Sequence, residues 1–249
     1  MSDAALASVL ATEAGEYLLG LRDSGDLSPE ELRRQGDAGS QDLLARRLGE
    51  ERPDDAVLSE EAKDSSERLS ASRVWIIDPL DGTREYGEGR ADWAVHVALW
   101  VDGELAAGAV AIPAEGLTLD TANPLPRPAP ADRIRLAVSR SRPPAFVTAL
   151  AEELDAELVP MGSAGVKATA VLRGQVDAYV HAGGQYEWDS AAPVAVARAA
   201  GLFTGRIDGS PLRYNQPDPL LPDLVVALPE VAQRVLAAVS AIELEEVPA

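Results

Sequence analysis

The chain has 249 residues, of which 46% are hydrophobic, so it can bury a large core as one domain or as two lobes. Its net charge of −19 argues against wrapping nucleic acid, whose phosphates require a basic surface. The lack of cysteine excludes disulfides, thiolate zinc sites and cysteine nucleophiles. No apolar run reaches the roughly 20 residues of a membrane span, and no basic start precedes an apolar block at the N-terminus. We expect a cytoplasmic protein that binds neither nucleic acid nor membrane.

The apolar pattern of the first half predicts helices followed by strands. Residues 3–22 carry apolar side chains at helical spacing, and residues 40–49 form a second amphipathic stretch. A strand is expected at residues 75–78. Two more, at 93–101 and 104–112, are joined by Asp-Gly, a strong hairpin signal. The first half is therefore predicted to be α+β with an antiparallel meander.

A proline-rich stretch separates the two halves. Residues 122–130 hold four prolines, which neither a helix nor a central strand tolerates. We expect an N-terminal α+β lobe over residues 1–125 and a C-terminal α/β lobe over residues 131–249. In the second lobe, strands are predicted near 134–139, 156–160, 176–181 and 223–228, and helices near 144–154, 163–173, 189–200 and 229–240.

The most informative segment is residues 74–83, Val-Trp-Ile-Ile-Asp-Pro-Leu-Asp-Gly-Thr. An apolar, β-branched run that ends at acidic residues predicts a buried strand with carboxylates at its C-terminal end. A proline between Asp78 and Asp81 fixes a turn that can direct both carboxylates at one hard cation such as Mg²⁺. Gly82 and Thr83 follow with free amides, which suit a phosphate group. Alone, such a segment is more often an ordinary surface turn.

Two further acidic motifs change this interpretation. Residues 58–61 read Leu-Ser-Glu-Glu, and residues 188–193 read Trp-Asp-Ser-Ala-Ala-Pro. Three motifs in this order resemble the inositol monophosphatase superfamily of Mg²⁺-dependent, lithium-sensitive phosphatases. The haloacid-dehalogenase phosphatases use a similar Asp-x-Asp-Gly-Thr motif, but here the two aspartates are three residues apart, not two, and that reading is rejected.

The resemblance implies a fold, a metal and a set of ligands. The fold is the layered αβαβα sandwich of this superfamily, an α/β (α+β) architecture. Two or three Mg²⁺ ions are expected in one site, because carboxylate and carbonyl oxygens suit that ion. Most of the ligands lie in the first lobe. The implied ligands are Glu61, Asp78, the Leu80 carbonyl, Asp81 and Asp189.

The resemblance also implies that a metal-activated water attacks phosphorus in line. Thr83 matches the threonine that orients and deprotonates this water, and Glu61 belongs to the same catalytic group. The partner of Thr83 is an upstream aspartate. Asp42 falls nearest to the expected place, with Asp37 as the alternative, and either residue also suits a helix cap.

Substrate contacts are expected mainly from the second lobe. Residues 162–167 match a segment that touches the non-reacting part of the substrate, and Lys167, one of only two lysines, suits a second phosphate. Residues 138–141, Val-Ser-Arg-Ser, resemble CysQ-type 3′(2′),5′-bisphosphate nucleotidases. The expected substrate-binding residues are Gly82, Thr83, Ser139, Arg140, Gly162, Ser163, Lys167, His181 and Asp189.

These resemblances imply hydrolysis of the 3′-phosphate of 3′-phosphoadenosine 5′-phosphate to AMP and phosphate, in sulfur assimilation or nucleotide recycling. Two alternatives stay open: a phosphatase for inositol 1-phosphate or fructose 1,6-bisphosphate, and a non-catalytic metal- or nucleotide-binding protein on the same scaffold. The expected partner is a small phosphorylated substrate. The resemblance is compatible with a homodimer.

Overall fold

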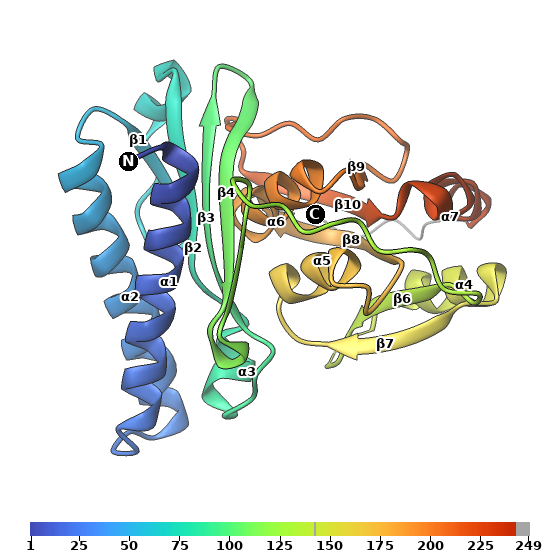
Figure 1. Ribbon diagram of the computed structural model, residues 1–249, viewed down its shortest axis with the longest axis horizontal. Helices are drawn as coiled ribbons and strands as arrows, with labels where there is room; N and C mark the ends of the chain where they lie inside the picture. Colours follow the sequence, from blue (N-terminus) through green and yellow to red (C-terminus); the bar gives the residue numbers. More distant parts are fainter. Residues whose placement is uncertain (142, 243–249) are drawn as a thin grey trace.

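The computed structural model describes residues 1–141 and 143–242 and contains five layers in the order αβαβα (Figure 1). Helices α1 (Asp3–Asp23) and α2 (Pro29–Glu51) form the first layer. They cover one face of a five-stranded sheet, and helices α5 (Ala164–Leu172) and α6 (Glu187–Ala199) lie between this sheet and a second one. The expected layered sandwich is confirmed.

The first sheet has the strand order β1-β2-β3-β4-β5. Strand β1 runs parallel to β2, and the remaining neighbours are antiparallel, which confirms the predicted meander. The strands are β1 (Ala56–Ser59), β2 (Arg73–Asp81), β3 (Ala94–Val101), β4 (Glu104–Ile112) and β5 (Leu117–Asp120). Between them lie the short helices η1 (Ser66–Ser70), α3 (Thr83–Gly87) and η2 (Pro113–Glu115).

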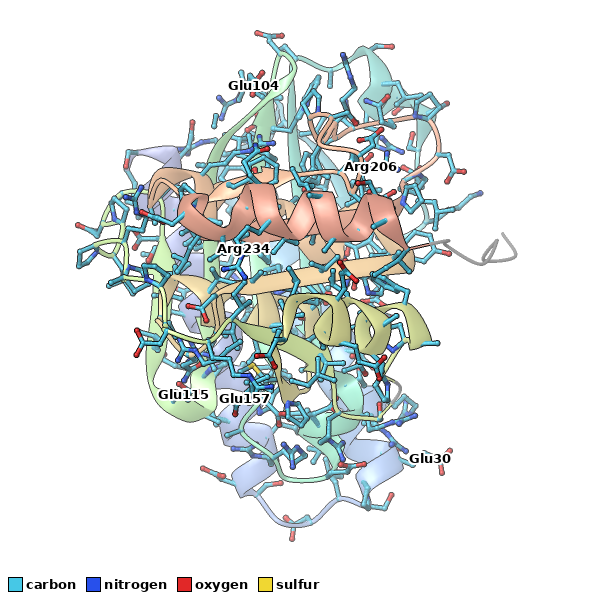
Figure 2. All side chains as sticks on the ribbon, turned by 90° about the vertical axis from the view of Figure 1, so that its right-hand side faces the viewer. Glu30, Glu104, Glu115, Glu157, Arg206 and Arg234 are labelled. Carbon is cyan, nitrogen blue, oxygen red and sulfur yellow. The ribbon has the colours of Figure 1, made fainter. Side chains whose placement is uncertain are left out.

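The second sheet has the order β7-β6-β8-β10-β9 and mixes parallel with antiparallel pairs. Helices α4 (Ala145–Leu154) and α7 (Pro229–Ala241) lie side by side on its outer face, with charged side chains such as Arg234 turned to the surface (Figure 2). The strands are β6 (Arg135–Ser139), β7 (Glu157–Met161), β8 (Ala178–Tyr186), β9 (Phe203–Gly205) and β10 (Leu220–Ala227).

An irregularity at the end of β2 prepares the functional site. Asp78 pairs with His96 and Asp81 pairs with Ala94, so the register shifts between the two aspartates. In a regular strand, side chains three residues apart point to opposite faces. The bulge, which contains Pro79, removes this alternation. Both aspartates are buried, with 1% and 8% of their surface exposed.

The second helix begins much earlier than the sequence pattern predicted. The expected range was 40–49, whereas α2 begins at Pro29. The start signals are local: the Ser28 side chain accepts a hydrogen bond from the Glu31 backbone NH, and proline stands in the first turn. The early turns carry few apolar side chains, so hydrophobic periodicity missed them. The elements β1, β5, β9 and α3 were missed because they span only three to five residues, too few for a period to show.

Helix α1 is long and apolar enough to cross a membrane by length and composition, contrary to the expectation that no segment would be. Leu6, Leu10 and Leu18 on this helix are completely buried. They belong to a core cluster with Trp75 and Val97 of the first sheet. The apolar face of α1 is thus explained by packing on that sheet.

Candidate functional site

Three carboxylates from distant parts of the chain converge at the end of β2. One oxygen each from Asp78, Asp81 and Asp189 lies within 4.8 Å of the others. Asp189 stands in the first turn of α6, where its Oδ2 accepts a hydrogen bond of 2.6 Å from the Tyr186 backbone NH. The first-turn cap therefore also fixes the direction of this carboxylate.

The electrostatics of these carboxylates suit a cation. Burial raises the pKa of Asp78 well above its usual value, and repulsion from Asp81 and Glu60 adds to the rise. Burial and repulsion from Asp81 also raise the pKa of Asp189 to about 6. Carboxylate oxygens are the donors that Mg²⁺ prefers. A divalent cation fits this donor set, because it would remove the repulsion that now raises both pKa values.

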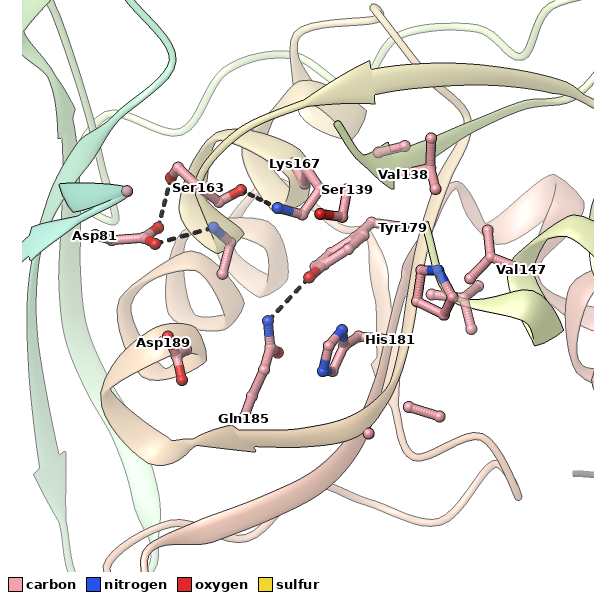
Figure 3. A pocket seen from close by; sticks show the side chains of 17 residues that line it. Asp81, Val138, Ser139, Val147, Ser163, Lys167, Tyr179, His181, Gln185 and Asp189 are labelled. Carbon is pink, nitrogen blue, oxygen red and sulfur yellow. Dashed lines mark hydrogen bonds between the residues drawn. The ribbon is translucent and has the colours of Figure 1, made fainter. Parts of the chain in front are cut away.

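Asp81 is held by the start of helix α5 (Figure 3). Ser163 Oγ donates to Asp81 Oδ2 at 2.5 Å, and the backbone NH groups of Ala164 and Gly165 donate at 3.1 and 2.7 Å. Ser163 has a φ of 53°, an uncommon value for a residue with a side chain. Strain of this kind is often retained where a precise geometry is required.

His96 lies against the carboxylates. Its ring is completely buried, with Nε2 3.3 Å from Asp81 Oδ2 and Nδ1 3.0 Å from the Trp188 carbonyl oxygen. Burial lowers the pKa of His96, but the contact with Asp81 outweighs burial and the net shift is upward. Burial likewise raises the pKa of Asp81, but His96 and Ser163 outweigh it and the net shift is downward.

The structure turns Glu60, and not the predicted Glu61, toward the carboxylates. The Glu60 side chain hydrogen-bonds to Asp78, and loss of hydration raises its pKa to about 7, with repulsion from Asp189 adding to the rise. The negative charge of Glu61 instead helps to raise the pKa of Asp37. Both residues lie at a bend just after β1, and the sequence pattern Glu-Glu does not say which one faces inward.

Thr83 begins helix α3 and lies close to Asp37. Thr83 Oγ1 is 3.5 Å from Asp37 Oδ1 and 3.1 Å from the Leu80 carbonyl oxygen. Burial raises the pKa of Asp37 to about 6, and repulsion from Glu61 adds to the rise. Asp42, preferred from the sequence, is exposed one turn further along α2. The structure thus places the alternative, Asp37, beside Thr83, and a catalytic role for Asp42 stays a prediction.

A cavity of about 430 Å³ opens beside the carboxylates (Figure 3). Its wall includes most of the predicted substrate-binding residues: Gly82, Ser139, Ser163, Lys167, His181 and Asp189. Lys167 is 8% exposed, and its Nζ donates to the Ser163 carbonyl oxygen at 2.6 Å. Burial lowers the pKa of Lys167, although the charge of Asp81 opposes that shift.

Three predicted contact residues are absent from this wall: Thr83, which lies by Asp37, and the pair Arg140 and Gly162. Arg140 Nη2 forms ion pairs with Glu85 at 3.0 Å and Glu88 at 2.7 Å. Gly162 is buried, and its backbone NH donates to Asp92 at 2.6 Å. Both residues therefore hold the two halves of the chain together, and substrate contact by either one stays a prediction.

Sequence reasoning missed two polar residues of the cavity, Tyr179 and Gln185. Tyr179 reads as an ordinary strand residue. Gln185 follows two glycines at the end of β8, where the sequence carries no signal for a side chain that turns back into the protein.

Comparison with known proteins identifies the family. The model of the inositol monophosphatase family matches residues 3–244. The chain belongs to this family. Among its relatives, a 3′-phosphoadenosine 5′-phosphate phosphatase from Mycobacterium leprae is 50% identical, covering 96% of this chain and 94% of the relative. A protein of the same name from Mycobacterium bovis is 52% identical, with 92% and 90% covered. The crystal structure of CysQ from Bacteroides thetaiotaomicron, a member of the family, is 26% identical with a TM-score of 0.77, covering 90% and 96%.

Proposed function

We propose that this chain is a phosphatase that removes the 3′-phosphate from 3′-phosphoadenosine 5′-phosphate, yielding AMP and inorganic phosphate. The convergence of Asp78, Asp81 and Asp189 next to a cavity carries the proposal. These carboxylates can hold divalent cations, and phosphoryl transfer needs such concentrated positive charge beside the substrate. The relatives of about 50% identity support the choice of substrate. The two alternatives from the sequence are less well supported.

The proposed cofactor is Mg²⁺, two or three ions per site. Asp78, Asp81 and Asp189 are its proposed ligands, together with Glu60 and the Leu80 carbonyl. Glu61 stays a prediction from the sequence. Bound Mg²⁺ would supply Lewis-acid stabilisation of the charge that develops on the phosphoryl oxygens.

Thr83 and Asp37 are proposed to hold the proton of the attacking water. The raised pKa of Asp37, about 6, suits a carboxylate that accepts a proton near neutral pH. Thr83 relays the interaction, since its hydroxyl can donate to Asp37 while its oxygen accepts from water. The proton passes from water toward Asp37 as the water attacks phosphorus.

Lys167 and Ser163 are proposed to bind the part of the substrate remote from the reacting phosphate. Lys167 is the one cation in the cavity wall among the residues that line it, and a second phosphate is a strong ligand for a buried ammonium. Ser139 and His181 line the same cavity. The lobe boundary near residues 122–130, the homodimer and the cytoplasmic location stay predictions.

Phosphate release tests the proposal. Purified protein with Mg²⁺ should hydrolyse 3′-phosphoadenosine 5′-phosphate with a higher kcat/KM than inositol 1-phosphate or fructose 1,6-bisphosphate. EDTA or the variant Asp81→Asn should abolish turnover, and millimolar lithium should inhibit it. Faster hydrolysis of either alternative substrate would refute the substrate assignment, and full activity of Asp81→Asn would refute the metal site.

A further inference from the structure

Two buried polar atoms in the cavity wall have no hydrogen-bond partner among the described residues: Gln185 Oε1 and His181 Nε2. Leaving a buried polar atom unpaired costs about 1–3 kcal/mol. Native proteins retain few such atoms, so two of them facing one cavity point to a ligand that pairs with both.

The backbone explains why both side chains reach the same cavity. Gly183 and Gly184 have φ values of 128° and 83°, which only glycine adopts readily. They turn the end of β8, and both Gln185 and His181 line the cavity (Figure 3). Gln185 is 8% exposed, and its Nε2 donates to Tyr179 Oη at 2.9 Å. With Nε2 bonded to Tyr179, the Oε1 end of the amide faces the cavity.

The tautomer of His181 follows from its other contact. The hydrogen bond with the Gly184 backbone raises the pKa of His181, as a bond donated by a ring N–H to a carbonyl oxygen does, and Nε2 is the nitrogen without a partner. Burial lowers the pKa of His181 to about 4, so the ring is neutral at pH 7 and Nε2 is an acceptor. The cavity therefore presents two acceptors at this point. Its remaining wall there is apolar and includes Val138 and Val147.

We propose that His181 Nε2 and Gln185 Oε1 bind the exocyclic amino group of the substrate's nucleobase. An amino group carries two N–H donors, one for each acceptor, while the apolar wall packs on the flat ring. A base with a keto oxygen at this position would place an acceptor against two acceptors. Sites built to pair a donor reject analogues that lack it. This inference rests on the proposed nucleotide phosphatase function.

The first test needs no variant. We expect kcat/KM for 3′-phosphoadenosine 5′-phosphate to exceed that for 3′-phosphoinosine 5′-phosphate about 10- to 100-fold, because the inosine base replaces the amino group with oxygen. Equal values for the two nucleotides would overturn the inference and leave the proposed function intact. Hydrolysis of neither nucleotide, with turnover of inositol 1-phosphate, would overturn both.

A matched pair of variants tests Gln185 itself. Gln185→Glu keeps an oxygen acceptor at the same place, whereas Gln185→Met keeps the length of the side chain and removes the acceptor. The preference for adenosine over inosine should persist in Gln185→Glu and fall about tenfold in Gln185→Met. Melting curves establish that each variant folds. A full preference in folded Gln185→Met, or its loss in folded Gln185→Glu, would contradict the assignment.

Discussion

Replacing Asp189 with asparagine should stabilise the metal-free protein while destroying its activity. The three carboxylates lie within 4.8 Å of one another, and two charges at that distance repel by about 3.5 kcal/mol at an effective dielectric constant of about 20. The raised pKa of Asp189, from 3.8 to about 6, corresponds to about 3 kcal/mol, with burial as its largest cause and repulsion from Asp81 as the second; asparagine removes both costs. Asparagine keeps an oxygen that can accept from the Tyr186 NH, so the helix start is preserved.

The stability that Asp189→Asn gains over wild type should increase as the pH rises. Because the folded-state pKa of Asp189 is raised, the native state keeps its proton where the unfolded chain has lost it. Wild type therefore loses this part of its stability as the pH rises from about 4 to about 6. Asp189→Asn should melt about 4–10 °C above wild type in EDTA at pH 8, and the difference should largely vanish at pH 4.

Magnesium should reverse the order of stability. Ligand at about 1,000 times its Kd stabilises a protein by about 4.1 kcal/mol, which exceeds the advantage of about 3 kcal/mol expected for Asp189→Asn. Mg²⁺ at that level should therefore raise the melting temperature of wild type above that of the variant, which should stay nearly unchanged. Turnover of the variant should fall at least about 100-fold. Thermal melts with and without EDTA, followed by a Mg²⁺ titration, measure both effects. A variant that melts at or below wild type in EDTA at pH 8 would refute the repulsion argument.

Three further substitution pairs or single changes test other parts of the site and the fold. Asp37→Asn should lower kcat about 10- to 100-fold, whereas the exposed control Asp42→Asn should stay within about twofold, as measured by phosphate release. Glu60→Gln should weaken Mg²⁺ binding at least about tenfold, and Glu61→Gln much less. A metal titration with the reverse order would show that Glu61, the ligand predicted from the sequence, binds the metal. Burial raises the pKa of Asp177, but hydrogen bonds to its carboxylate outweigh burial and the net shift is downward. The contribution of Asp177 to folding stability is therefore fully present above pH 3.8 and is lost as the pH falls through the folded-state pKa. Asp177→Asn should therefore destabilise the protein by about 1–3 kcal/mol at pH 7, with a smaller loss near pH 3 in denaturant titrations.

The chemistry of the site was readable from the sequence because it lies in short, contiguous motifs. Asp78 and Asp81 are three residues apart on one strand, and the apolar run before them predicted that strand correctly. The layered fold followed from the resemblance that these motifs carry, and Asp189 from the last of them. Each of these predictions depends on local order along the chain.

Features that depend on the direction of a side chain were not readable. The choice between Glu60 and Glu61 depends on which residue faces inward at the bend after β1. The choice of Asp37 depends on where a polar helix begins, and polar turns leave no hydrophobic period. Gln185 reaches the cavity through a glycine turn whose path is set by the opposite strand β10.

The short segment 163–165 has two neighbours at once. Ser163 and Gly165 donate hydrogen bonds to the carboxylate of Asp81 on the first sheet. Ser163 and Ala164 also form part of the cavity wall. Any adjustment of this helix start to suit a differently shaped substrate would also move a proposed metal ligand. Altering what the enzyme accepts while keeping its catalytic power should therefore be easier at the far wall of the cavity, around His181 and Val147, than at this junction.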